Sequence, residues 1–158
     1  MNASYRGSID MLLHTAIMAH PVISGITPSL PEANPSVMAC VKKYLAIYRD
    51  FIRPFMGQAK VYHHTPVING VDGEGWCALE YVAPCKGRAV AAVFRLIHAK
   101  EDVYQLRFRG LDMGAKYRVC IEPLGESFVA EGSELARQGL DIRLDIALSS
   151  QLIMLERE

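Results

Sequence analysis

Two hydrophobic periods divide the chain near residue 57. Before it, apolar residues recur every three to four positions, which is typical of amphipathic helices. After it, apolar and polar residues alternate in short runs, which is typical of half-buried strands. The pattern predicts a mainly β, α+β fold, with two helices in residues 1–57 and an antiparallel β-sandwich of about eight strands in residues 58–158.

Both predicted helices carry one apolar face. The face of the first consists of Ile9, Leu12, Leu13, Ala16 and Ile17, spaced i, i+3, i+4, i+7 and i+8. Pro21 is expected to end this helix. In the second helix Asn34 suits the N-cap, Pro35 suits the first position, and Pro54 is expected to close it. Its face consists of Val37, Val41, Tyr44, Leu45, Tyr48 and Ile52.

Turn signals such as "NGVDGEG", "PCKG" and "GLDMGAK" separate the predicted strands. The strands are expected at 59–65, 76–83, 88–98, 103–109, 116–122, 126–130, 139–146 and 149–156. The clearest alternation is "LDIRLDI", in which Leu140, Ile142, Leu144 and Ile146 are predicted to face the core. "GSELARQG" predicts one helical turn. Short strands without intervening helices favour a sandwich of two sheets.

Charge and cysteine usage exclude several classes of protein. Seventeen Lys and Arg balance seventeen Asp and Glu, so no basic excess favours nucleic acid. The N-terminal sequence does not resemble a signal peptide, and no run of eighteen apolar residues predicts a membrane helix. The four cysteines form no CxxC pair, and Cys77 and Cys120 lie in apolar strands, so we expect buried free thiols. These features favour a cytoplasmic protein.

The segment "KVYHHTPVINGVDGEGWCALEYV" at residues 60–82 holds the most conspicuous side chains. Neighbouring residues of a strand point to opposite faces, so His63 and His64 are not expected to share a metal ion. We expect one of them to be packed and the other exposed. Trp76 is expected to pack in the core or at an interface, with a sugar-stacking platform as the alternative.

No self-sufficient catalytic set is visible. Glu80 lies in mid-strand, and a cross-strand pair with Arg95 is the expected explanation for it. Cys85 is a turn thiol beside Lys86 without a neighbouring histidine, which leaves a small hydrolase as a minor alternative. GxSxG, GxGxxG and P-loop motifs are absent, and we expect no cofactor and no metal.

The order of several segments nevertheless resembles one known family. They are "IYRDFIRP", "VYHHTP", "GWCALEYVAP", "AVAAVFRL", "YQLRFRGLDMGAKYRV", "EGSELARQGLDIRL" and "SSQLIMLE". In this order they resemble the C-terminal portion of bacterial α-galactosidases of glycoside hydrolase family 36, over roughly residues 36–158. Residues 1–35 are similar to the last helix of the catalytic barrel and its loop. The family's barrel carries an aspartate nucleophile in a K-W-D-type strand end, and this motif is absent here.

The resemblance implies an accessory domain of an enzyme that hydrolyses terminal α-galactosides with retention, through a covalent glycosyl-aspartate. This chain alone is then expected to be inactive, and its partner would be a catalytic barrel or a second copy bound through the helical segment as a homo-oligomer. His63, His64 and Trp76 would face the barrel or a carbohydrate. The alternative is a stand-alone carbohydrate-binding or interaction module. Its candidate aromatics are Tyr62, Trp76, Tyr104 and Phe108, although the alternation of Tyr104 and Phe108 with Leu106 indicates burial.

Overall fold

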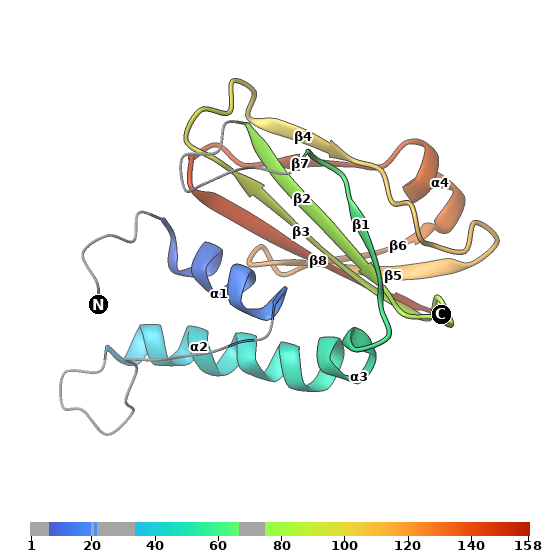
Figure 1. Cartoon of the computed structure of the whole chain (residues 1–158), viewed down its shortest axis with the longest axis horizontal. Coiled ribbons are helices and arrows are strands. Elements are labelled where there is room, and N and C mark those ends of the chain that lie inside the picture. The colour runs from blue at the N-terminus through green and yellow to red at the C-terminus, as the bar shows by residue number, and fades with distance from the viewer. Residues whose placement is uncertain (1–6, 20, 22–33, 67–74) are drawn as a thin grey trace.

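The computed structural model describes residues 7–19, 21, 34–66 and 75–158. Helices cover one face of a six-stranded antiparallel sheet, and a two-stranded sheet covers the other (Figure 1). The helices are α1 (Ile9–Ile17), α2 (Pro35–Ile47), the π-helical turn η1 (Tyr48–Ile52), α3 (Arg53–Met56) and α4 (Gly132–Arg137). The strands are β1 (Lys60–His63), β2 (Trp76–Val82), β3 (Arg88–Arg95), β4 (Val103–Leu106), β5 (Lys116–Glu122), β6 (Glu126–Glu131), β7 (Leu140–Arg143) and β8 (Ser149–Arg157). The predicted fold class is confirmed.

The larger sheet has the strand order β1-β2-β3-β8-β5-β6 and separates two hydrophobic cores. Strand β3 contributes side chains to both cores. Successive side chains of a strand point to opposite faces, so Ala91 and Val93 enter one core while Ala92 and Phe94 enter the other. All four are buried, which explains why this strand reads as an unbroken apolar run.

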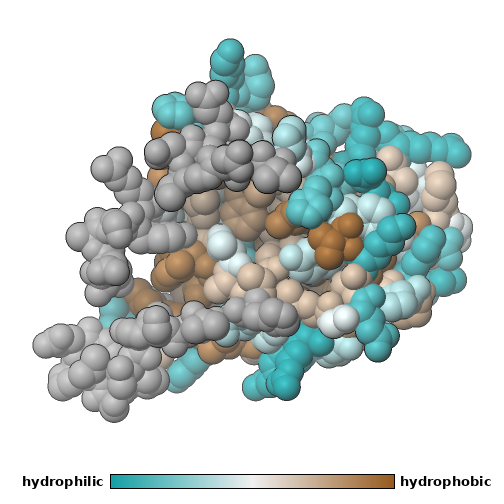
Figure 2. Space-filling view, in the orientation of Figure 1, coloured by the Kyte–Doolittle hydropathy of each residue, from teal (hydrophilic) through white to brown (hydrophobic). Residues whose placement is uncertain are grey.

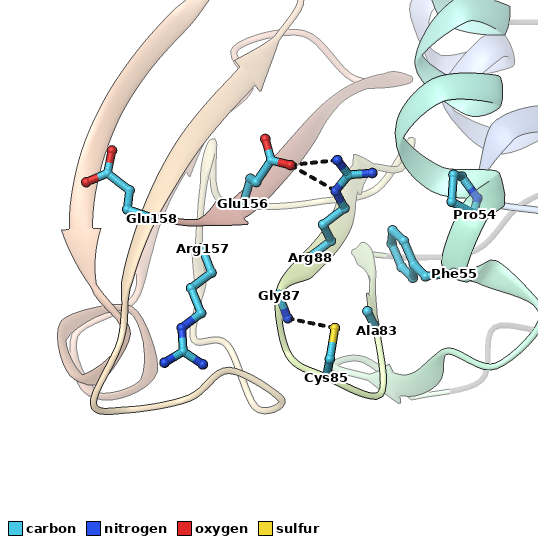
Figure 3. Close-up of a pocket in the computed structure, with 9 residues that line it drawn as sticks. All are labelled: Pro54, Phe55, Ala83, Cys85, Gly87, Arg88, Glu156, Arg157 and Glu158. Atoms are coloured by element: carbon cyan, nitrogen blue, oxygen red, sulfur yellow. Dashed lines mark hydrogen bonds and ion pairs between the residues drawn. The ribbon is translucent and has the colours of Figure 1, made fainter.

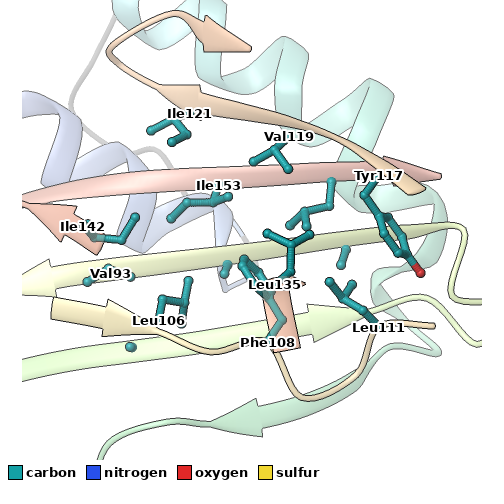
Figure 4. Packing of buried hydrophobic residues seen from close by; sticks show 14 of the residues in the cluster. Val93, Leu106, Phe108, Leu111, Tyr117, Val119, Ile121, Leu135, Ile142 and Ile153 are labelled. Carbon is teal, nitrogen blue, oxygen red and sulfur yellow. The ribbon is translucent and has the colours of Figure 1, made fainter. Parts of the chain in front are cut away.

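The core beneath β4 and β7 is built from the inward faces of both sheets (Figure 4). Leu106 and Ile142 of the small sheet are nearly inaccessible to solvent and pack with Val119 and Ile153 of the large sheet. Leu135 of α4 extends the cover, so "GSELARQG" forms the helical turn that its sequence predicts. The sandwich is therefore uneven, with six strands against two.

The alternation in "LDIRLDI" holds for Ile142 and Leu144 and is wrong for Ile146. Leu144 is 7% exposed, whereas Ile146 is 74% exposed. Strand β7 ends at Arg143 because the chain must then cross from the small sheet to the centre of the large one. The crossing is marked by Leu148, which has a φ of +58° and donates its backbone N–H to the carbonyl of Arg95.

Local signals explain where the helices begin. The side chain of Ser8 accepts a hydrogen bond from the Met11 N–H at the start of α1. The side chain of Asn34 accepts one from the Ser36 N–H, so the predicted cap of α2 is confirmed. Residues 22–33 and most of the predicted turn "NGVDGEG" lie outside the described residues.

The second helix continues past Pro54, contrary to the expectation that this residue closes it. The turn widens at η1, where the Arg53 N–H donates to the carbonyl of Tyr48, five residues earlier. This wider turn lets α3 begin at Arg53, so that Pro54 lies in a first helical turn where its missing N–H is not needed. The helical part then ends at Met56.

The helices pack on the large sheet and form the second core. Leu13 and Ile17 of α1 and Tyr44 of α2 are almost completely buried there. They meet sheet residues that include Phe94 and Leu152. The apolar helix faces predicted from the sequence therefore lie mostly on the chain's own sheet, and the helical and β parts share this core. A division into two domains near residue 57 stays a prediction.

Self-association through the helical segment also stays a prediction, and the structure indicates where to test it. Figure 2 shows hydrophobic residues toward the left and centre of one face and hydrophilic residues along its right and upper edges.

Of the exposed large hydrophobic residues in the described part, Leu45 alone lies on a helix, at 37% exposure. Leu45→Glu is expected to convert a dimer to a monomer in light scattering. Ile146→Glu, outside the helices, should not, and a wild-type chain that stays monomeric at high concentration contradicts the prediction.

Candidate functional site

His63 and His64 lie at the end of the edge strand β1 and differ in environment, as alternation predicts. The His64 side chain is 7% exposed, and its Nε2 lies 2.8 Å from Oε2 of Glu80. His63 is exposed, and its backbone carbonyl accepts a hydrogen bond from Nη1 of Arg109 at 3.2 Å. Only His63 therefore offers a side chain to a partner.

Glu80 is the most deeply buried charged residue of this region, with no exposed surface. Besides His64, its carboxylate accepts the backbone N–H groups of Arg109 at 2.9 Å and Gly110 at 3.0 Å. The chain approaches closely here, because a Cβ on Gly110 would lie 2.4 Å from a methyl carbon of Val82. Three donors around one carboxylate compensate its loss of hydration.

The predicted pair between Glu80 and Arg95 is wrong. In the register of β2 and β3, Glu80 lies opposite Ala91 and Arg95 lies opposite Trp76. The guanidinium of Arg95 instead donates to the carbonyls of Leu144 at 2.5 Å and Ala99 at 3.3 Å. It thereby ties together the loops that follow β3 and β7.

Trp76 packs against the core beneath β4 and β7. Its ring lies 5.5 Å from that of Tyr104, at an interplanar angle of 36°. Tyr62 and Tyr104 are also half-buried, and Phe108 is 2% exposed. In the described part of the chain, these four candidate aromatics form no exposed row such as a sugar-stacking platform needs.

Cys85 lies in an open cavity of about 430 Å³ between α3 and the end of β8 (Figure 3). The lining residues are Pro54, Phe55, Ala83, Cys85, Gly87, Arg88, Glu156, Arg157 and Glu158. The Cys85 sulfur accepts the N–H of Gly87 at 3.4 Å, and Arg88 is bound to Glu156 at 2.7 and 2.9 Å. No histidine is among the lining residues, so the cavity provides no base to activate this thiol.

The remaining candidate chemistry is limited. Cys40, Cys77 and Cys120 are half-buried free thiols, so the prediction of full burial is too strong, and burial raises the pKa of Cys77. Among the described residues no group of three His, Cys, Asp or Glu side chains is placed to hold a metal ion. None of the described helices is long and apolar enough to span a membrane.

A model of the glycosyl hydrolase family 36 C-terminal domain matches residues 76–155. The chain belongs to this family. The match begins at Trp76 and runs to Leu155 in β8, so it covers both the small sheet and five strands of the large sheet. The buried carboxylate of Glu80 and the cross-sheet contacts of Arg95 are thus features of a family 36 domain.

Similar solved structures include the family 36 alpha-galactosidase AgaA from Geobacillus stearothermophilus, at 22% identity and a TM-score of 0.73, covering 99% of this chain and 20% of that chain. The alpha-galactosidase from Lactobacillus brevis gives 21% identity and a TM-score of 0.63, covering 80% of this chain and 17% of that one. The galactosidase domain of the alpha-galactosidase-sucrose kinase AgaSK gives 16% identity and a TM-score of 0.61, covering 79% of this chain and 16% of that one. No curated protein matches significantly. The chain thus spans a fifth or less of each structure, and these likenesses show the fold.

Sequence analysis of this family 36 domain missed a polar cluster among the helices. His14 of α1 is fully buried and its Nδ1 lies 2.8 Å from the Ser150 hydroxyl on β8. Tyr44 of α2 donates its hydroxyl to Asp10 at 2.9 Å. The one available signal was the i, i+4 spacing of Asp10 and His14 on a helix face. Ser150 is 136 residues away in the sequence, so no local pattern links the two.

Proposed function

We propose that this chain is a C-terminal accessory domain of an α-galactosidase-like glycoside hydrolase, and that it acts by packing against a catalytic domain. The observation that carries the proposal is the extent of the likeness. The family model covers residues 76–155, and the similarity to AgaA extends over 99% of the chain, helices included. A segment that retains the fold of one part of a longer enzyme is best explained by the role of that part.

Retaining hydrolysis of terminal α-galactosides is the activity we propose for the whole enzyme. Solved structures with this fold are named as alpha-galactosidases, which supports the substrate class. Such chemistry needs two carboxylates about 5–5.5 Å apart across the scissile bond. In this chain Glu80 is enclosed by its own three donors, and Glu156 and Asp102 are bound to Arg88 and Arg143. We therefore assign the reaction to the partner domain.

The end of the sandwich beside α1 offers surface for such a partner. Ile97 is 37% exposed and Ile146 is 74% exposed, in the loops after β3 and β7. The Ser8 N–H donates to the carbonyl of Leu148, so α1 begins at this same end. Exposed apolar residues that gather on one surface often mark an interface. His63, His64 and Trp76 stay candidates for barrel contact, and of these His63 is the exposed one.

A stand-alone carbohydrate-binding or interaction module is the alternative function. It would need aromatic rings that present a face to solvent, and the half-buried Tyr62, Trp76 and Tyr104 do not provide one. Galactose that perturbed the resonances of these rings at millimolar concentration would favour this module over the accessory domain.

The purified chain is expected not to hydrolyse nitrophenyl α-galactoside, because the buried Glu80 is enclosed by its own donors while Glu156 and Asp102 are bound to arginines. The assay compares the release of nitrophenol with buffer alone. Turnover above buffer that disappears when one of the chain's own acids is replaced, for example by Glu80→Gln, would contradict the assignment of catalysis to a partner domain.

A further inference from the structure

The polar cluster around His14 connects helices α1 and α2 with strand β8 of the large sheet. The His14 ring stands edge-on to the ring of Tyr44 at 4.8 Å and 87°, which joins α1 to α2. Its Nδ1 is 2.8 Å from the hydroxyl of Ser150, which joins α1 to β8. Both His14 and Ser150 are buried, at 0% and 3% exposure. This cluster is therefore a buried polar link between the helices and the sheet, beside the bonds of Tyr81 to the Met18 carbonyl and of Lys43 to Glu122.

The geometry of the ring favours its neutral form. Nε2 of His14 is buried and has no hydrogen-bond partner among the described residues. A neutral ring accommodates this if Nδ1–H donates to Ser150 and Nε2 carries the lone pair. A second proton would place a charged N–H where the described residues offer no acceptor, and a buried donor without an acceptor is costly.

Burial has a larger effect on the pKa of His14 than the charges around the ring. Asp10 on α1 favours the protonated ring, Lys43 on α2 opposes it, and the partner from β8 is the neutral Ser150. Burial outweighs both charges and lowers the pKa of His14 from 6.5 to about 4. Because the pKa is lower in the folded chain, the stabilising effect of neutral His14 is complete above about pH 6.5 and is lost as the pH falls toward 4.

We propose that His14 is a pH-sensitive latch whose protonation releases the helical layer from the sheet while the opposite core stays intact. The two cores lie on opposite faces of the large sheet. None of the described residues of α1, α2 and α3 takes part in the core beneath β4 and β7. Release would uncover an apolar sheet face that includes Val90, Ala92, Phe94 and Leu152. Acid would thus increase the fraction of molecules in which this apolar face is uncovered.

Amide hydrogen exchange of the full chain at pH 7 and pH 5 tests the latch. After correction for intrinsic rates, the opening of α1 is expected to increase about 20-fold at pH 5, as linkage requires for this lowering of the pKa. Amides of β5 in the other core should not follow. His14→Phe should remove the increase, because phenylalanine keeps the edge-on contact and does not titrate. His98→Gln, at an exposed histidine, should retain it.

A second measurement decides the matter if His14→Phe does not fold. In the wild-type chain, the ring resonance of His14 is expected to stay that of the neutral form down to about pH 5. Titration of His14 near pH 6.5 in the folded chain would overturn the proposal. Unchanged exchange of α1 between the two pH values, or an equal increase in His14→Phe, would overturn it as well.

Discussion

Replacing Glu80 with alanine is expected to destabilise the fold by about 3–5 kcal/mol, the range for breaking a buried charged pair. The change leaves the N–H groups of Arg109 and Gly110 and the ring of His64 without their acceptor. These groups lie in the edge strand region and in the segment that leads to β5, so their loss loosens the sheet edge. The free energy of unfolding is obtained from urea denaturation.

Two variants control this prediction. Glu80→Gln keeps the size of the side chain and one acceptor oxygen, so its loss of stability should be smaller than that of Glu80→Ala. Glu126→Ala removes an exposed carboxylate on β6 and should stay within about 0.5 kcal/mol of the wild type. A Glu80→Ala variant as stable as Glu126→Ala would mean that the carboxylate does not anchor this region.

Leu144→Ala is expected to cost about 2–5 kcal/mol of stability, whereas Ile146→Ala should change it by less than about 0.5 kcal/mol. The two residues are two positions apart in one alternating run, yet Leu144 is 7% exposed and Ile146 is 74% exposed. Leu144 packs in the core beneath β4 and β7, and truncation leaves a cavity there. Denaturation in parallel with the wild type gives both values.

This pair also tests the register of the small sheet. Equal losses in the two variants would mean that strand β7 continues through Ile146, as the alternation alone predicts. Losses below about 0.5 kcal/mol in both variants would mean that this face of the run points to solvent, because residues two apart in a strand share a face.

These contrasts show what the hydrophobic pattern determines and what it does not. Alternation assigns each strand residue to a face, which is why Ile142 and Leu144 were predicted to be buried and Arg143 to be exposed. It contains no information on where a strand must stop to change sheets, so Ile146 was placed in the core. It also does not define strand register, so Glu80 was given Arg95 as its partner, and its three donors were missed.

In the helical part, too, features set by neighbouring residues could be predicted and features set by tertiary contacts could not. The apolar faces and the cap at Asn34 were visible in the sequence, because both depend on residues that lie close together along the chain. The passage through Pro54 was not, since it depends on a widened turn at Tyr48–Ile52. The buried contact of His14 was not predicted, because its partner Ser150 is brought close only by tertiary structure.

The resemblance to family 36 told more about function than any local motif of the sequence. The order of segments from "IYRDFIRP" to "SSQLIMLE" indicated the C-terminal portion of a family 36 enzyme, and the family model matches residues 76–155 of that stretch. The candidate segment 60–82 contributed to this conclusion only through the strings "VYHHTP" and "GWCALEYVAP", as parts of the order and not as a catalytic set. Within the described residues, the side chains of that segment serve packing and hydrogen bonding.

The central claim is that this chain works as part of an α-galactosidase, and immunodepletion of an extract of its source cells tests it most directly. An antibody against the purified chain should remove α-galactosidase activity from the extract, and a catalytic barrel should appear in the precipitate, covalently joined to the chain or bound to it. If the antibody removes the chain completely while the activity stays in the supernatant and no barrel is precipitated, the chain is not an accessory domain of such an enzyme.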